Sequence, residues 1–333
     1  MSRPWLFAAM AAVAVAVYLG LGLTKSKTTA TVTTPKNAHG IVLPGTIYLA
    51  QGGRLYAYHS GDFTQLRTED GAWSQPAVVP GAGQLLAVNR GAEWSDVYLL
   101  ADNGTTVRQL TRNNRSTKDL SLNHWAFYPH PAAGGEVLYS YDSPKDGYEV
   151  DLAIWQMSLA RTQASAVRRT EPNGYTGGDV YPNPLNGGGV LYSKFKSDAT
   201  TGTIVSELWL QLGLRTAGAA LTDPQDDCGQ PALSPDQTLV AMVCTGGKQA
   251  GRLEIASFDG QQLGPAVTLA TGQLAAPAWS PDGRRIAYLA PAAAQGPFQL
   301  WEVDLSGGPA HPKPAQRATE NLDLDATSPP AWG

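Results

Sequence analysis

Residues 277–305 read PAWSPDGRRIAYLAPAAAQGPFQLWEVDL, and this stretch decides the fold. It contains a Pro-led strand, a tight turn, an apolar strand and, after a loop, a second apolar strand. In the turn, Pro281 favours φ near −65°, Asp282 can bond its own backbone, and Gly283 suits the exit position. The segment therefore predicts antiparallel strands, and we assign Asp282 to the turn rather than to catalysis.

The same unit recurs along the chain, and each copy closes near a Leu-Thr or Arg-Thr pair. The copies start at Pro76, Pro129, Pro182, Pro231, Pro277 and Pro330, with gaps of 53, 53, 49, 46 and 53 residues. This period is near the length of a four-stranded propeller blade and well above that of leucine-rich or ankyrin repeats.

The repeat that starts at Pro330 contains only PAWG, and the segment from Thr46 supplies its continuation. Tyr48-Leu49-Ala50 there match Tyr288-Leu289-Ala290. A blade is a small sheet with two faces to bury, so it needs a neighbour on each side, which a ring provides. We therefore predict an all-β, six-bladed β-propeller of four-stranded antiparallel blades over residues 45–333, with one blade split between the two ends.

The PxWSPDG, IAY, LW and LT pattern resembles the TolB-like, WD-type propeller repeats of many exported bacterial proteins. The resemblance is strongest over residues 277–305, good over 231–242, and weaker in the repeats from Pro129 and Pro182, where the turn reads HPAAGG or NPLNGG. The residues before it do not read as the separate α/β domain that TolB carries. The resemblance implies a fold rather than a function, because propellers host binding and enzymatic roles alike.

The N-terminus reads as a targeting segment. Residues 5–23 form an uninterrupted apolar run, preceded by Arg3 and followed by Lys25 and Lys27. As a helix this run would span ~28 Å, close to the thickness of a hydrocarbon core. Residues 1–23 are therefore predicted to be a transmembrane signal-anchor or, alternatively, a cleaved signal peptide with small residues such as Ala14-Val15-Ala16 at the cut.

Residues 24–44, rich in Thr and Lys, have no clear strand or helix periodicity before Ile41 and predict a flexible tether. The propeller would then be anchored to the membrane on the periplasmic or extracellular side, or secreted if the signal is cleaved.

The two cysteines agree with export. Cys228 and Cys244 lie on either side of the turn at Pro235-Asp236-Gln237, so in a simple hairpin they face each other. That cross-strand distance permits a disulfide, which an oxidising compartment would preserve. Two buried free thiols remain the alternative.

Composition and motifs exclude several classes of protein. The formal net charge is −4, and no basic run or interleaved basic and aromatic stripe is present, so a nucleic-acid partner is not expected. The sequence contains no nucleophile elbow, phosphate-binding loop, HExxH motif or EF-hand loop. We expect no cofactor and no catalytic residue of these types.

Candidate binding residues lie just before the Pro positions, because the innermost strand of each blade lines the central channel. These channel-mouth candidates are Trp73, His124, Asp179, Asp227 and Asp325. Three Asp around one opening could hold a cation or a basic peptide, or only hydrate the channel.

Two connections, residues 141–151 and 196–206, are longer than the matching turn at Gln51-Gly52-Gly53. Extra loop length on a rigid ring is a common place for binding. The first loop would carry an acidic, tyrosine-bearing patch of Tyr141, Asp142, Asp146, Tyr148 and Glu149.

The sequence as a whole favours a membrane-tethered extracytoplasmic propeller that acts as a protein-protein interaction or assembly module, with an envelope protein or membrane complex as partner. One alternative is a metal-dependent hydrolase or lactonase-type enzyme at the channel mouth. A ligand sensor is the other.

Overall fold

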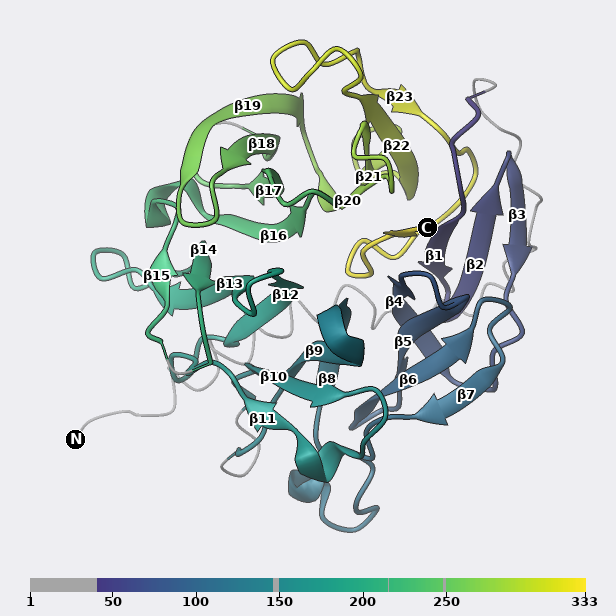
Figure 1. Ribbon diagram of the computed structural model, residues 1–333, viewed down its shortest axis with the longest axis vertical. Helices are drawn as coiled ribbons and strands as arrows, with labels where there is room; N and C mark the ends of the chain where they lie inside the picture. The colour runs from purple at the N-terminus through teal and green to yellow at the C-terminus, as the bar shows by residue number, and fades with distance from the viewer. Residues whose placement is uncertain (1–40, 146–149, 215, 248–249) are drawn as a thin grey trace.

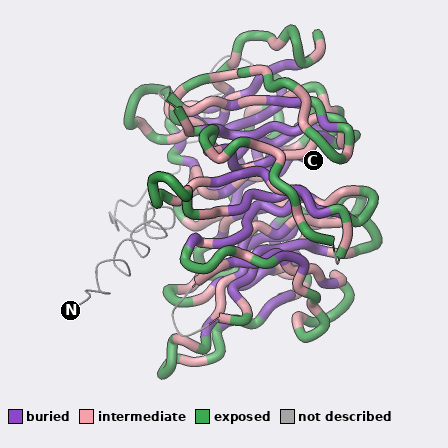
Figure 2. The backbone as a smooth tube through the Cα atoms, turned by 90° about the vertical axis from the view of Figure 1, so that its left-hand side faces the viewer, coloured by how far each residue is buried: buried purple, intermediate pink, exposed green. Residues whose placement is uncertain are grey.

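The computed structural model describes residues 41–145, 150–214, 216–247 and 250–333. These residues form six four-stranded antiparallel sheets, arranged as blades around a central axis (Figure 1). Seen from the side in Figure 2, buried backbone runs through the inside of the ring, and exposed turns mark its two faces. The predicted six-bladed propeller is confirmed.

Five of the sheets follow one another along the chain. The first two are β4 (Ala72–Val79), β5 (Gln84–Arg90), β6 (Ser95–Ala101) and β7 (Thr106–Gln109), then β8 (Ala126–Ala132), β9 (Glu136–Tyr141), β10 (Ala153–Ser158) and β11 (Val167–Arg168). The next two are β12 (Asp179–Pro184), β13 (Val190–Ser197), β14 (Ile204–Gln211) and β15 (Ala219–Ala220), then β16 (Cys228–Leu233), β17 (Leu239–Cys244), β18 (Arg252–Phe258) and β19 (Leu263–Thr271). The fifth is β20 (Ala275–Trp279), β21 (Arg285–Pro291), β22 (Phe298–Asp304) and β23 (Gln316–Arg317).

Short 3-10 turns lie in the connections and at one hairpin. They are η1 (Leu120–Leu122), η2 (Ala133–Gly135), η3 (Gln163–Ser165) and η4 (Pro224–Asp226).

The sixth blade joins the two ends of the described chain. Its sheet is β24 (Ala331–Trp332), β1 (Ile47–Gln51), β2 (Arg54–His59) and β3 (Asp62–Gln65). Trp332 is paired with Ile47, and reciprocal backbone hydrogen bonds join Thr46 and Gly333 at 2.6 and 2.9 Å. In Figure 1 the C-terminus accordingly lies beside β1. The predicted split blade is confirmed.

In the five blades that follow one another along the chain, the innermost strands begin two to four residues before the prolines from which the sequence predicts them to start. Each of the five long inner strands has a bulge at an X-Pro pair, where the ladder register shifts. The residues before proline all have φ between 51° and 57°, and they are Gln75, Tyr128, Tyr181, Gln230 and Ala276. A bulge leaves a residue outside the ladder, so a proline without an N–H is tolerated there.

The bulges also connect neighbouring blades. The Gln75 side-chain oxygen accepts a hydrogen bond from the Tyr128 N–H at 2.7 Å, and the Gln230 side-chain oxygen accepts one from the Ala276 N–H at 2.6 Å. The Gln75 N–H in turn donates to the Ser328 hydroxyl at 2.6 Å. Side chains at the bulges therefore pair backbone groups of the next blade.

The threonine that closes the repeat pairs with a third-strand N–H in four blades. The threonine hydroxyl accepts this bond at 2.9 to 3.0 Å, in the pairs Val97 with Thr111, Ile154 with Thr170, Leu208 with Thr222, and Leu300 with Thr319. This contact gives the repeated Leu-Thr or Arg-Thr pair a structural reason: the hydroxyl holds the outer end of the blade to its third strand.

The hydrophobic core lies between the blades. Ile47 and Leu49 of the closing blade pack with Leu289 and Leu300 of the fifth sheet. Leu43 is buried in the same cluster, with Ile41 packed against it. The last residues of the predicted tether therefore pack against the propeller, and its boundary at residue 44 stays a prediction.

The predicted disulfide is confirmed. Cys228 and Cys244 are bonded across β16 and β17, where they are directly paired with a Cα–Cα distance of 4.0 Å.

The predicted apolar segment 5–23 and most of the tether lie outside the described residues. Within the part of the chain that is described, no helix has the length and apolar character needed to cross a membrane.

Candidate functional site

The structure places two of the five channel-mouth candidates in internal structural contacts. Trp73 is fully buried; its indole N–H donates to the Glu69 carbonyl at 2.7 Å, and its ring meets Tyr98 edge-on. Asp179 is also fully buried and pairs with the Lys194 ammonium at 3.1 Å. Burial raises the pKa of Asp179, while Lys194 opposes that shift. Both residues belong to inner strands that begin before the prolines, and both side chains are enclosed by protein.

His124 and Asp325 also have local partners. The His124 ring nitrogen Nδ1 lies 2.9 Å from the Asp142 carboxylate. The Asp325 carboxylate accepts hydrogen bonds from the N–H and hydroxyl of Thr327, at 2.9 and 2.7 Å. Asp325 therefore fixes the turn that leads into the closing strand β24.

The long loop after β9 begins with two residues of the predicted acidic, tyrosine-bearing patch. Tyr141 and Asp142 are buried, and burial raises the pKa of Tyr141 to about 12. Asp142 accepts a hydrogen bond from the Trp125 N–H at 3.0 Å and lies 3.5 Å from the Lys145 ammonium. Both side chains therefore anchor the start of the loop. Asp146, Tyr148 and Glu149 lie outside the described residues.

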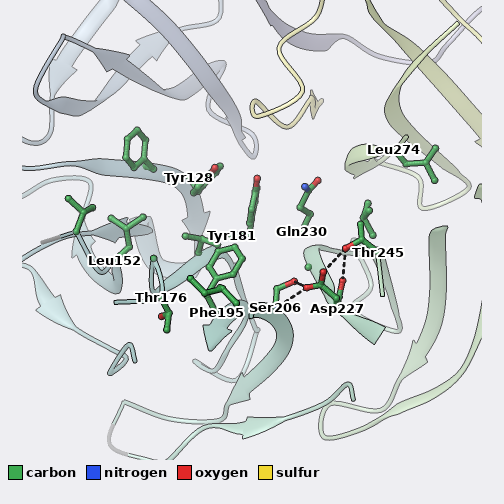
Figure 3. A pocket seen from close by; sticks show the side chains of 17 residues that line it. Tyr128, Leu152, Thr176, Tyr181, Phe195, Ser206, Asp227, Gln230, Thr245 and Leu274 are labelled. Atoms are coloured by element: carbon green, nitrogen blue, oxygen red, sulfur yellow. Dashed lines mark hydrogen bonds between the residues drawn. The ribbon is translucent and has the colours of Figure 1, made fainter. Parts of the chain in front are cut away.

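Asp227 is the channel-mouth candidate that borders a cavity. This cavity, of about 320 Å³, lies between the inner strands β8, β12 and β16 (Figure 3). We call it the mouth cavity; its lining residues are Phe127, Tyr128, Val150, Leu152, Thr176, Gly177, Val180, Tyr181, Phe195, Ile204, Ser206, Asp227, Gly229, Gln230, Val243, Thr245 and Leu274. Its volume is within the range of small-molecule sites.

Two blades hold the Asp227 carboxylate in place. Oδ1 accepts from the Ser206 N–H at 2.7 Å and from the Ser206 hydroxyl at 3.1 Å. Oδ2 accepts from the Thr245 hydroxyl at 2.6 Å. Figure 3 shows these bonds at one end of the cavity, with the rings of Tyr181 and Phe195 alongside. The site is therefore an apolar, aromatic cavity with one fixed carboxylate.

A second cavity, of about 610 Å³, occupies the channel on the proline side of the bulges. Its walls include Pro76, Pro129, Pro182, Pro231 and Pro277, one from each of the five long inner strands. Tyr128 and Tyr181 border both cavities, with ring centroids 4.0 Å apart. This aromatic pair marks the boundary between the two halves of the channel.

No three His, Cys, Asp or Glu side chains are grouped to hold a metal ion within the described residues. Asp179, Asp227 and Asp325 each have separate partners, so the structure does not bring them together. A metal-dependent hydrolase therefore stays a prediction. The described residues contain no group of three metal-ligating side chains that supports it.

Sequence reasoning missed Ser206 and Thr245, which position Asp227. A signal was available, because Asp227 directly precedes Cys228 and Thr245 directly follows Cys244. If the cysteines are opposite each other, their neighbours are also close across the two strands. Ser206 comes from another blade, and only the packing of β14 against β16 brings it near.

Six four-stranded sheets that close into a ring define the class of protein as a six-bladed β-propeller. The structure is similar to the crystal structure of TolB from Acinetobacter baumannii, with 15% sequence identity, a TM-score of 0.64, and coverage of 86% of this chain and 66% of that chain. A putative TolB from Agrobacterium tumefaciens, 13% identical, matches with a TM-score of 0.56 over 86% of this chain and 92% of that chain. A gluconolactonase from Xanthomonas campestris, 11% identical, matches with a TM-score of 0.52 over 87% and 89% of the two chains.

These comparisons show a shared fold, and the predicted TolB-like architecture is confirmed at that level. No family model matches the chain, and no curated protein matches it. The chain spans just under two thirds of the Acinetobacter TolB, and the same fold occurs in a lactonase. Fold alone therefore leaves both binding and enzymatic roles open.

Proposed function

We propose that the protein is a membrane-tethered, extracytoplasmic propeller that binds a partner protein of the cell envelope. The apolar run at residues 5–23 and the Cys228–Cys244 disulfide support export. The propeller shared with TolB provides a rigid ring on which loops can bind a partner.

The observation that carries the proposal is an exposed tyrosine on a fixed loop. Tyr175 is 72% exposed and lies in the connection between β11 and β12. The Asp151 carboxylate accepts hydrogen bonds from the N–H groups of Tyr175, Thr176 and Gly177, at 2.6, 2.9 and 2.8 Å. Three backbone bonds to one carboxylate hold this loop in a single conformation.

Such a loop has the physical properties of a protein-binding site. Tyrosine is enriched among the residues that dominate binding energy at interfaces. A loop that is already ordered loses less conformational entropy on binding. Thr176 and Gly177 also line the mouth cavity, so a partner that contacts Tyr175 would lie at the channel mouth.

Site-specific photo-crosslinking in the native membrane tests this proposal. A photoreactive residue would replace Tyr175 in the full chain, and a matched one would replace Val107, which is 52% exposed on the outer strand β7. We expect position 175 to give one dominant crosslink to an envelope protein, at least about tenfold more than position 107.

Identical products at both positions, or none at position 175, would contradict the proposal. An Asp151→Asn variant tests the role of the ordered loop. A neutral amide accepts weaker hydrogen bonds from the three N–H groups, so the crosslink at position 175 should decrease.

A further inference from the structure

The mouth cavity contains one fixed negative charge in otherwise uncharged surroundings. Among its described lining residues, Asp227 is the only acidic or basic one, and ten others are aliphatic or aromatic. A cavity that is mainly apolar with a few oriented polar groups is the usual form of a small-molecule site.

The Asp227 charge has no cationic partner among the described residues. Its hydrogen bonds come from neutral donors, namely the Ser206 N–H, the Ser206 hydroxyl and the Thr245 hydroxyl. Asp179 and Asp142 differ, because lysine ammonium groups lie 3.1 and 3.5 Å from their carboxylates. The Asp227 carboxylate at the cavity wall is therefore held by neutral donors alone among the described residues.

The carboxylate also has room for another donor. Its Oδ2 atom accepts one bond, from Thr245, while Oδ1 accepts two from Ser206. A carboxylate oxygen has two lone-pair sites, so Oδ2 can accept a further charge-assisted hydrogen bond.

The Asp227 site is organised before any ligand arrives. Ser206 belongs to β14, and Thr245 follows β17 next to the Cys228–Cys244 disulfide. Groups from two blades therefore orient the Asp227 carboxylate. The disulfide joins the ends of β16 and β17, next to Asp227 and Thr245. A pre-ordered site binds with a smaller entropy cost.

We propose that the mouth cavity binds a small amphiphilic monocation, an amine with an aromatic or alkyl body. Its ammonium group donates to Oδ2 of Asp227, and its apolar body lies against rings such as Phe127, Tyr181 and Phe195. A cation near these rings gains further stabilisation from their π faces. This assignment does not depend on the envelope-partner proposal.

Calorimetric titration of the full chain with three probes of matched shape provides the test. The probes are 4-phenylbutylammonium, the neutral 4-phenylbutanol and the anionic 4-phenylbutanoate. We expect the ammonium probe to bind at least about tenfold more tightly than the alcohol, and the carboxylate probe to bind most weakly. Equal affinity for amine and alcohol, or no binding of the amine, would overturn the proposal.

Two variants with the same change in net charge locate the binding. Asp227→Asn removes the charge in the cavity, and Asp226→Asn removes a neighbouring charge whose side chain is 57% exposed and does not line the cavity. We expect Asp227→Asn to lower the affinity for the ammonium probe at least about tenfold, with little change in the affinity for the alcohol. Asp226→Asn should bind all three probes like the wild type. Equal weakening by both variants would refute the site. If Asp227→Asn fails to fold, the comparison of the three probes on the wild-type chain still decides.

Discussion

Asp304 shows how a single carboxylate is held at the end of a blade strand. Its Oδ2 atom accepts a hydrogen bond from the Lys313 ammonium at 2.8 Å, and its Oδ1 atom accepts one from the Ser306 N–H at 2.7 Å. The Lys313 and Ser306 hydrogen bonds, with a smaller contribution from Arg285, hold the pKa of Asp304 well below its usual range. The ionised form is therefore favoured by the folded state.

We expect Asp304→Asn to lower the free energy of unfolding by about 1–2 kcal/mol at pH 7, because hydrogen bonds to a charged group are lost. A carboxylate with a depressed folded pKa stabilises the protein above its unfolded pKa of about 4 and loses this effect as the pH falls below it. The difference between variant and wild type should therefore shrink between pH 4 and pH 2. Urea denaturation across this range measures it.

Asp323→Asn, on an exposed residue, serves as the charge control. A difference for Asp304→Asn that is as large at pH 2 as at pH 7 would show that its cause is packing rather than charge.

At the residue scale, the repeat pattern indicates which acidic residues lie near the start of an inner strand. It does not indicate what their side chains contact. It selects Asp227, which lines the mouth cavity. It also selects Asp179, but Lys194 pairs with that side chain inside the blade. The pairing depends on which residues of β12 and β13 face the same side, and the bulge at Tyr181 changes that register.

At the element scale, closing threonines hold the outer end of four blades to the third strand. Thr319 is fully buried, and its hydroxyl accepts from the Leu300 N–H at 2.9 Å and donates to the Gln299 side chain at 3.2 Å. The other threonines of this kind make the same contact with a third-strand N–H.

We expect Thr319→Val to lower the free energy of unfolding by about 1–3 kcal/mol, because it leaves the buried Leu300 N–H without its acceptor. The shape of the side chain is nearly unchanged, so cavity formation contributes little. Thr268→Val is the control, since the Thr268 hydroxyl makes only an exposed contact of 3.4 Å with Glu254. Equal effects of the two substitutions on the urea midpoint would refute this role.

Repeat spacing and the turn residues predict the order and type of the blade strands, because a period near 50 with apolar runs suits few folds. They do not predict the bulges. The residue before a proline is ordinarily extended, whereas Gln75 and Tyr128 have φ of 53° and 51°. This conformation belongs to the bulge in each inner strand, where the ladder register shifts.

At the scale of the whole molecule, ring closure depends on a close backbone contact at Gly45. Gly45 has φ of 72°, and a Cβ there would lie 2.2 Å from the Gly333 carbonyl oxygen. Gly52 has a similar φ of 57°, but a Cβ there would meet nothing within 4 Å. A side chain at either glycine would therefore have the same backbone strain. Only a side chain at Gly45 would also collide with Gly333.

We expect Gly52→Ala to lower the free energy of unfolding by about 1 kcal/mol, the cost of a left-handed backbone with a side chain. Gly45→Ala should lower it by more than twice as much, because the methyl group displaces Gly333 from Thr46. Thermal and urea unfolding of the two variants measure the difference. An equal decrease in the free energy of unfolding in both variants would mean that ring closure contributes little to stability.

Sequence reasoning predicts this closure because Tyr48-Leu49-Ala50 match the second strand of the repeat from Pro277. It cannot predict the mouth cavity, whose walls come from three blades. Their relative position depends on blade twist and packing, which no single repeat encodes.

The pairing of Ile47 with Trp332 also affects how the protein folds during its synthesis. Strand β1 is among the first parts of the propeller to be synthesised, and its partner β24 is among the last. At 5–20 residues per second, β1 waits on the order of half a minute with one edge open. An open strand edge is a template for wrong pairing. The nascent chain therefore has a long period in which a chaperone, or the membrane surface, would have to keep that edge from aggregating.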